Sequence, residues 1–224
     1  MNSFNAQEDF AAERESMVER QLIARGVRDR AVLDAMRAVP RHAFVPPALR
    51  ALAYSDTPLP IGNEQTISQP YIVARMIEAA SLRADARVLE VGTGSGYAAA
   101  VLARIAARVD TIERHRVLAD RACATLAQLG VDNVDVHCAD GTLGWADAAP
   151  FDAIIAAAGG PGVPDAWRAQ LSDGGHIVMP VGARHTQQRL VRLTRIGAER
   201  FDERDLGAVH FVALIGAHGW PDTQ

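Results

Sequence analysis

The run from Val88 to Tyr97 constrains the fold of this chain more than any other stretch. It opens with apolar residues typical of a buried strand, places the carboxylate of Glu90 near the strand end, and passes through three alternate glycines into an alanine-rich segment. Glycine suits such a loop because it adopts positive φ and lets a ligand approach the backbone closely. A strand, a glycine loop and a helix in this order predict a ligand at the carboxyl end of a parallel sheet.

The spacing of the glycines limits the kind of ligand. A dinucleotide fingerprint reads Gly-x-Gly-x-x-Gly, but Tyr97 stands where its third glycine belongs, and Gly96 comes one residue early. The spacing therefore disfavours a nicotinamide dehydrogenase. An acidic residue before Gly-x-Gly-x-Gly resembles the S-adenosylmethionine loop of class I methyltransferases. This ligand has no pyrophosphate to place at a helix N-terminus, and its amino group suits a nearby carboxylate.

The composition excludes several other classes of function. A net charge of -4 lacks the basic footprint of a nucleic-acid-binding protein. All 23 basic residues are arginine, which excludes a Schiff-base or Walker-type lysine. The histidines and the cysteines Cys123 and Cys138 show no metal or redox spacing, and no apolar run is long enough to span a membrane. Because a signal peptide is also lacking, we expect a cytoplasmic protein without a metal site.

The hydrophobic pattern predicts one α/β domain. With 224 residues and 49% hydrophobic content the chain can bury a single core. We expect a flexible lead-in over 1–16 and one domain over 17–220. Within it we distinguish N-terminal helices and a loop that covers the site (17–82), a cofactor-binding core (83–182) and C-terminal strands (183–220).

The expected elements alternate along the core. The predicted helices cover 17–25, a stretch through Val32 and Met36 that ends at Pro40, then 71–82, 97–107, 115–129 and 164–171. The predicted strands cover 87–91, 109–113, 134–138, 151–157, 176–181, 188–195 and 208–215. This order predicts a doubly wound, mostly parallel Rossmann-like sheet with helices on both faces, an N-terminal helical appendage and an antiparallel C-terminal edge. The proline-rich stretch 40–70 is expected to be an ordered functional loop.

Acidic residues end three successive predicted strands, at Glu90, Glu113 and Asp140. The carboxyl ends of parallel strands meet at one edge of a sheet, where ligands bind. Glu113 follows Glu90 by about 20 residues, the offset expected for an acid that binds ribose hydroxyls. Asp140 is then placed to accept an adenine amino group, with Gly141 leaving room for the ring. Polar residues often end strands for solubility alone, but three in register with a glycine loop favour a ligand.

A second informative stretch runs from Glu64 to Pro70. Taken alone, it favours a polar turn in which Ser68 or Gln69 caps a helix that has Pro70 in its first turn.

Together these segments resemble the protein-L-isoaspartate O-methyltransferase family over roughly residues 17–220. The most specific element is Gln-Thr-Ile-Ser-Gln-Pro at 65–70, supported by the loop at 88–97 and by Ala139-Asp140-Gly141. Further matching segments are 17–22, 39–41, 44–46, 59–62, 144–145, 149–155 and 180–182. The resemblance implies methyl transfer from S-adenosyl-L-methionine to the free carboxyl of isoaspartyl residues in damaged proteins, by a monomer that binds neither nucleic acid nor membrane.

The resemblance also implies roles for single residues. Ser68 is expected to be catalytic. The expected cofactor-binding residues are Gln65, Thr66, Ile67, Ser68, Glu90, Gly92, Thr93, Gly94, Ser95, Glu113, Asp140 and Gly141. The expected substrate residues are Pro60, Ile61, Val212 and Leu214.

Three departures from the family pattern concern the acceptor side. Glu64 replaces a usual glycine, the segment Ala158–Gly162 is richer in glycine than usual, and Ala213 replaces the proline of a usual Val-Pro-Leu element. Two alternatives therefore stay open beside the family activity. One is a methyltransferase for another carboxylate or a small-molecule acceptor, and the other is an adaptor that binds the cofactor without catalysis.

Overall fold

One seven-stranded sheet organises the computed structural model, which describes residues 10–184 and 186–222. Its order is β5-β4-β3-β6-β7-β8-β9, in which β5 to β7 run parallel and β8 and β9 are antiparallel. The strands of this sheet are β3 Arg87–Val91, β4 Arg108–Glu113, β5 Val134–Cys138, β6 Phe151–Ala156, β7 Leu171–Val181, β8 Gln188–Gly197 and β9 Arg200–Val209. The predicted doubly wound, mostly parallel fold with an antiparallel edge is confirmed.

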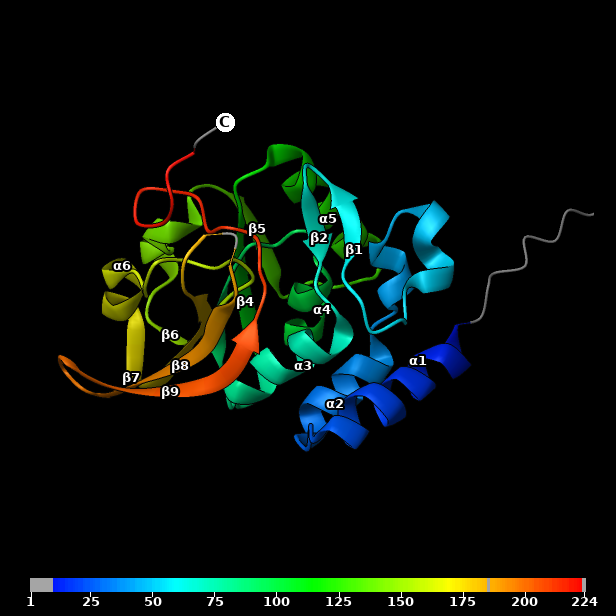
Figure 1. Cartoon of the computed structure of the whole chain (residues 1–224), viewed down its shortest axis with the longest axis horizontal. Coiled ribbons are helices and arrows are strands. Elements are labelled where there is room, and N and C mark those ends of the chain that lie inside the picture. The colour runs from blue at the N-terminus through cyan, green and yellow to red at the C-terminus, as the bar shows by residue number, and fades with distance from the viewer. Residues whose placement is uncertain (1–9, 185, 223–224) are drawn as a thin grey trace, which may run out of the picture.

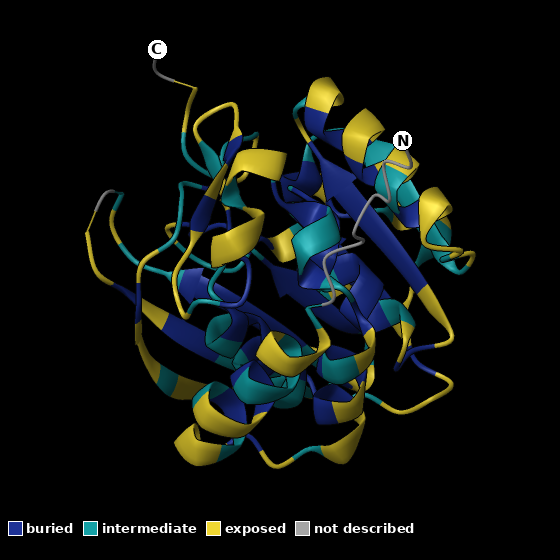
Figure 2. Cartoon of the chain, turned by 90° about the vertical axis from the view of Figure 1, so that its right-hand side faces the viewer, coloured by how far each residue is buried: buried dark blue, intermediate teal, exposed yellow. Residues whose placement is uncertain are grey.

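Helices cover both faces of the sheet. They are α1 Ala11–Met17, α2 Arg30–Ala38, α3 Pro70–Ala79, α4 Tyr97–Ala103, α5 Arg116–Gln128 and α6 Asp165–Ala169. Alternate strand residues face opposite sides, so Val88 joins the core under α1–α5, whereas Leu89 joins a second core with Trp167 of α6. In Figure 2 the central strands are buried and the outer faces of the helices are exposed.

The N-terminal helices lie at the opposite side of the molecule from β8 and β9 (Figure 1). The first helix begins at Ala11 and not at Met17, and it continues through a π turn at Val18–Leu22 and a 3₁₀ turn at Ile23–Arg25. The rings of Phe10 and His42 pack against each other in a tilted arrangement, with 4.5 Å between their centroids. This tertiary contact could not be predicted from the charged sequence of the segment. The expected lead-in is therefore helical from Ala11, and 1–9 lie outside the described residues.

The stretch 40–70 is ordered and carries more structure than expected. It contains 3₁₀ helices at Arg41–Phe44 and Pro47–Leu52 and then a hairpin of β1 Leu59–Gly62 and β2 Gln65–Ile67. The hairpin turn runs through Asn63 and Glu64, both with positive φ. Such turns usually use glycine, so the residues Asn63 and Glu64 are only a weak signal of a hairpin.

The last strand differs from the prediction of 208–215. β9 pairs with β8 from Arg200 to Val209, and the chain then leaves the sheet. The many charged residues of β9 are typical of a polar turn, but they lie on an exposed edge strand, where charges discourage pairing with other chains.

Two further 3₁₀ helices follow β5, at Gly141–Leu143 and Ala146–Ala148.

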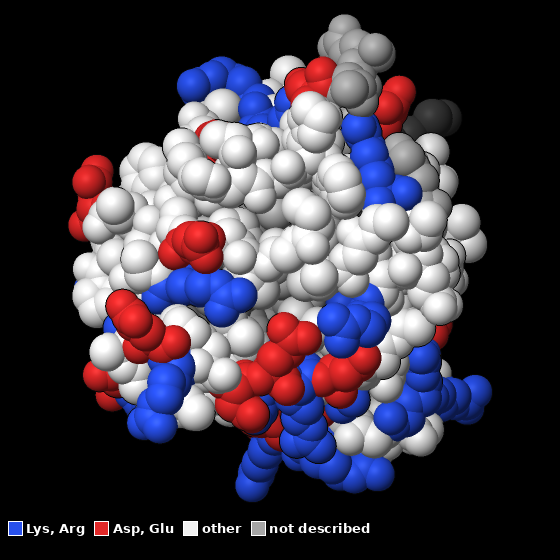
Figure 3. Space-filling view, turned by 60° about the vertical axis from the view of Figure 1, so that its left-hand side comes forward, with Lys and Arg blue, Asp and Glu red and all other residues white. Residues whose placement is uncertain are grey.

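The surface on the side shown in Figure 3 carries intermixed charges of both signs. Arg189, for example, lies between Glu203 and Asp205, at 3.5 Å from each. Within the described ranges, no helix combines the length and apolar character needed to cross a membrane. In the same residues no group of His, Cys, Asp and Glu side chains is arranged to hold a metal ion.

Candidate active site

The glycine loop follows β3 and is fixed by its neighbour β4. The amides of Gly92 and Thr93 both donate to the carbonyl of Ile112, at 2.8 and 3.2 Å. Gly96 has φ +87°, and a Cβ there would lie 3.2 Å from the Cβ of Ala122. The loop therefore needs this glycine both for its backbone conformation and for the close packing of α4 against α5.

Glu113, at the end of β4, ties the loop to the next connection. One carboxylate oxygen accepts from the amide of Gly94 at 2.9 Å, and the other accepts from the amide of His115 at 2.9 Å. The side chain is buried, yet each oxygen keeps a lone pair for a further donor. The predicted role of Glu113 in receiving the hydroxyls of a ribose stays a prediction, and these free lone pairs are what it requires.

Glu90 is buried in β3 and contacts a pair of threonines. Thr111 donates to its carboxyl at 2.6 Å and also lies 2.7 Å from the hydroxyl of Thr93. Burial raises the pKa of Glu90 to about 8, and the negative charge of Glu113 adds to this, while the Thr111 hydrogen bond lowers it only in part. A buried carboxyl with this environment favours a cationic partner.

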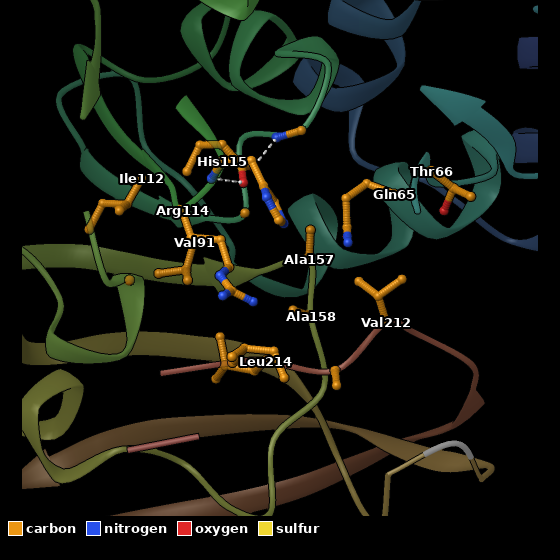
Figure 4. Close-up of a pocket in the computed structure, with 16 residues that line it drawn as sticks. Gln65, Thr66, Val91, Ile112, Arg114, His115, Ala157, Ala158, Val212 and Leu214 are labelled. Carbon is orange, nitrogen blue, oxygen red and sulfur yellow. Dashed lines mark hydrogen bonds between the residues drawn. The ribbon is translucent and has the colours of Figure 1, made fainter. Parts of the chain in front are cut away.

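A cavity opens at the ends of β3, β4 and β6, and we call it the strand-end cavity (Figure 4). It measures about 660 Å³ when the open solvent at its mouth is included. The predicted residues Gln65, Thr66, Gly92, Gly94, Glu113 and Gly141 all line it. Others that line it, and that were not among the predicted site residues, are Val91, Ile112, Arg114, His115, Ala157, Ala158, Ala213 and Ile215.

A second cavity, the Ser68 cavity, adjoins the first and shares Thr66, Gly92 and Gly94 with it. It also contains the predicted residues Ile67, Ser68, Glu90, Thr93 and Ser95. Its apolar wall comes from Val73, Met76, Ile77, Tyr97, Ala98, Leu102, Ile155 and Phe211, which the sequence analysis missed because they read as ordinary core positions. The two cavities bring a hydroxyl, a buried carboxyl and the glycine loop to one place.

Ser68 lies between β2 and α3 and does not cap the helix. The N-cap residue of α3 is Gln69, and no side chain makes a cap hydrogen bond there. Of the two residues offered as caps, Gln69 does occupy the N-cap position, although its side chain makes no cap hydrogen bond, and Ser68 is not the cap. Pro70 occupies the first turn as expected. Ser68 remains available to a ligand in the cavity that it lines.

An outer groove adjoins the strand-end cavity. It is lined by Asn63, Glu64, Gln65, Arg114, His115, Arg184, Val212, Ala213, Ile215 and Asp222. Glu64 is exposed at this groove. Val212 and Ala213 line both the groove and the strand-end cavity, so the two spaces share a wall.

Asp140 is less directly placed than expected. It accepts from the amide and hydroxyl of Thr142, at 2.9 and 2.6 Å, and from the amide of Ala217 at 2.8 Å. Although partial burial raises its pKa, these hydrogen bonds hold the pKa below its ordinary value. The carboxylate thus orders the chain around the strand-end cavity, and only its neighbour Gly141 lines that cavity.

The predicted substrate residues lie in different surroundings. Val212 lines the outer groove, whereas Leu214 is buried against the strand-end cavity. Ile61 is buried, and its Cδ1 lies 3.3 Å from where a Cβ on Gly94 would be. Pro60 is exposed on β1. Ile61 therefore presses the hairpin onto the glycine loop.

The sequence of this chain is similar to a known protein family over most of its length. The sequence profile of protein-L-isoaspartate(D-aspartate) O-methyltransferase matches residues 12–219. A protein-L-isoaspartate O-methyltransferase of Rhodopseudomonas palustris is 60% identical over 93% of this chain and 95% of its own length. One from Methylorubrum extorquens is 58% identical over 96% of this chain and 93% of its own length.

Solved structures show the same architecture. A protein-L-isoaspartate O-methyltransferase structure superposes with a TM-score of 0.83 at 28% identity, covering 92% of this chain and 67% of the other. A Plasmodium falciparum structure, described as a beta-aspartate methyltransferase in complex with S-adenosyl-L-homocysteine, has a TM-score of 0.77 at 24% identity, with coverages of 90% and 98%.

Proposed function

Because this chain belongs to the protein-L-isoaspartate(D-aspartate) O-methyltransferase family, we propose that the two cavities carry its transfer of a methyl group from S-adenosyl-L-methionine to the free carboxyl of L-isoaspartyl residues in damaged proteins. The observation that supports this assignment is that Ser68 and Glu90 line one cavity, Glu113 lines the other, and the two cavities share the glycine loop as a wall. The outer groove that adjoins it is the proposed entry for the protein or peptide acceptor.

The cofactor supplies an electrophilic methyl group on a sulfonium sulfur, and the residues present fit it. The carboxyl of Glu90 matches the positive amino group, and the carboxylate of Glu113 matches the ribose hydroxyls. The strand-end cavity, with Gly141 and Leu214 in its wall, offers an apolar slot for the base. Gly92 and Gly94 line both cavities, so one elongated ligand can lie across the loop.

The acceptor needs orientation more than activation. An isoaspartyl α-carboxyl has a reference pKa of about 3.5, so it is ionised at neutral pH and is already the nucleophile. We assign Ser68 the role of donating a hydrogen bond that aims one carboxylate oxygen along the line of displacement. The hairpin β1–β2 and Phe211 then keep water from the reacting atoms.

We further propose that the enzyme acts as a cytoplasmic monomer on proteins or peptides with isoaspartyl residues, without nucleic acid or membrane. The net charge of -4 and the mixed surface charges support the last two points. Both cysteines are free, in keeping with a reducing compartment.

The direct test compares two peptides that differ only in one linkage. We expect methyl transfer to an isoaspartyl peptide and none to its normal aspartyl twin. Equal rates on both would contradict the assignment and support an enzyme for another carboxylate. Tight binding of S-adenosyl-L-homocysteine without any transfer would instead support the adaptor alternative.

Ser68→Ala is expected to lower kcat about tenfold, which corresponds to the loss of one hydrogen bond to a charged group. Affinity for S-adenosyl-L-homocysteine and the melting temperature should stay nearly unchanged, because Ser68 makes no helix cap. Asp29→Ala is a suitable control, since Asp29 does cap α2 by accepting from the amide of Val32 at 3.1 Å. It should lose about 1 kcal/mol of stability and keep its turnover. A destabilised but fully active Ser68→Ala enzyme would contradict the assigned role.

Glu64→Gly is expected to change the KM for an isoaspartyl peptide less than threefold, because the Glu64 side chain is exposed. A carboxylate about 4 Å from the acceptor would repel it by about 4 kcal/mol at an effective dielectric of 20, so a facing charge would show clearly. Glu64→Gln, measured in parallel, removes the charge and leaves the turn residue with a side chain. An improvement of tenfold or more in both variants would mean that Glu64 faces the acceptor.

A further inference from the structure

Gln188 is a buried amide at the first position of β8, and its side chain is 2% exposed. Its Oε1 accepts from the backbone amide of Phe211 at 2.9 Å, and its Nε2 donates to the carbonyl of Phe211 at 3.4 Å. One side chain therefore satisfies both main-chain groups of one residue. Buried amides must be paired in this way, because a buried donor or acceptor without a partner destabilises the fold.

This contact lies where the chain leaves the sheet. β9 ends at Val209, opposite Gln188, and the following residues 211–214, here called the crossover segment, move over to the end of β6. There Gly159 donates to the carbonyl of Val212 and accepts from the amide of Leu214, each at 2.8 Å. The side chain of Gln188 thus extends the ladder between β8 and β9 to Phe211, just before the crossover segment pairs with Gly159.

The crossover segment forms a wall of all three spaces of the site. Phe211 lines the Ser68 cavity, and Leu214 lines the strand-end cavity. Val212 and Ala213 lie between the strand-end cavity and the outer groove. Figure 4 shows Val212 of this segment below Gln65 and Thr66 of the hairpin, and Leu214 further along it, below Val91 and Arg114. A displacement of the segment would change the width of the site for cofactor and acceptor together.

The glycine at position 159 is coupled to this amide. A Cβ on Gly159 would lie 2.5 Å from Nε2 and 2.7 Å from Cδ of Gln188. Because Gln188 is buried and both polar atoms of its amide are hydrogen-bonded, its side chain cannot move away from a Cβ at position 159. The contact accounts for the departure at Gly159, where the family resemblance pointed to an unusual glycine-rich stretch.

We propose that Gln188 is a positioning residue for methyl transfer, whose amide fixes the crossover segment so that the acceptor carboxylate and the cofactor are held in line. This role rests on the activity proposed above. Gln188 touches neither ligand itself and acts through Phe211.

The chain contains a matched control for this test. Gln170 makes the same kind of contact elsewhere: its Oε1 accepts from the amide of Trp145 at 2.7 Å, and its Nε2 donates to the carbonyl of Leu143 at 2.9 Å. Gln188→Met and Gln170→Met each keep the side-chain length and remove both hydrogen bonds. We expect kcat/KM for an isoaspartyl peptide to fall at least fivefold in Gln188→Met and less than twofold in Gln170→Met, at similar losses of melting temperature.

A second variant separates positioning from folding. In Gln188→Glu the new carboxyl is buried, and burial raises the pKa of a carboxyl. While it is protonated it can still donate to the Phe211 carbonyl and accept from its amide, whereas the carboxylate formed at higher pH cannot donate and repels the carbonyl. Activity relative to the natural enzyme should therefore be within threefold at pH 6 and at least fivefold lower at pH 8.5, at a temperature where both stay folded. A pH profile parallel to that of the natural enzyme would overturn the proposal, as would equal kinetic effects of the two methionine variants.

Hydrogen exchange distinguishes this inference from the function itself. If the natural enzyme fails to methylate the isoaspartyl peptide, the function proposal fails, but the crossover segment can still be examined. Gln188→Met should speed amide exchange over 211–214 at least fivefold, while exchange there stays unchanged in Gln170→Met. Unchanged exchange in Gln188→Met would overturn the role of Gln188 in holding the segment.

Discussion

Replacing Glu113 with alanine is expected to weaken binding of S-adenosyl-L-homocysteine by about 3 kcal/mol, on the order of a hundredfold in Kd. The variant loses the carboxylate that we assign to the ribose hydroxyls. It also leaves the amides of Gly94 and His115 without their acceptor, so the glycine loop loses its link to the end of β4. The effect should therefore reach the upper end of the range for hydrogen bonds to a charged group.

Titration calorimetry with Glu78→Ala as control isolates the ligand contribution. Glu78 also accepts from two main-chain amides, those of Arg28 at 2.6 Å and Asp29 at 2.8 Å, but it lies at the end of α3 outside both cavities. Its removal should lower the melting temperature and leave the ligand Kd within twofold. Equal losses of affinity in both variants would show that Glu113 acts only by stabilising the fold.

The sequence predicts best where local pattern and tertiary environment agree. β3 and β5 begin and end at the predicted residues, because short runs of β-branched and apolar residues between turn signals match what a central parallel sheet requires. The strand-end acids Glu90 and Glu113 were found for the same reason, since parallel strands bring their carboxyl ends to one edge.

The errors share a different cause. The helix start at Ala11, the hairpin turn at Asn63–Glu64 and the charged strand β9 depend on contacts with distant residues or on positive φ at residues other than glycine. Local propensity has little weight at such places, because tertiary packing overrides it. Asp140 illustrates the same limit within the site. It lies at a strand end as the sequence predicts, but the hydrogen bond from the amide of Ala217 to its carboxylate joins residues far apart in the sequence and cannot be predicted from local pattern.

Gln188 shows what the sequence leaves out entirely. A glutamine at the start of a strand is indistinguishable from a surface residue until the strand is seen to face Gly159. The only local signal was the glycine-rich stretch after β6, which indicated that something approaches the backbone there.

Glu90 is expected to make the stability of the ligand-free enzyme fall as the pH rises from about 4.5 to about 8. In this window the folded protein holds the proton of Glu90, whereas the unfolded chain, with an ordinary pKa, has released it. Unfolding therefore releases a proton, and a higher pH favours the unfolded state by up to about 1.4 kcal/mol per pH unit. Chemical denaturation at several pH values should show this slope, and Glu90→Gln should lack it.

Binding of the cofactor product reverses the preference of Glu90. The ammonium group of S-adenosyl-L-homocysteine stabilises the carboxylate, so binding at pH 7 should release close to one proton, and affinity should increase with pH up to about 8. Calorimetry in two buffers of different ionisation enthalpy measures the released proton directly. Glu90→Gln binds the ligand more weakly, and its observed enthalpy should be the same in both buffers. If the natural enzyme gives equal enthalpies in the two buffers, Glu90 does not face the amino group, and its buried carboxyl serves only the hydrogen bond with Thr111.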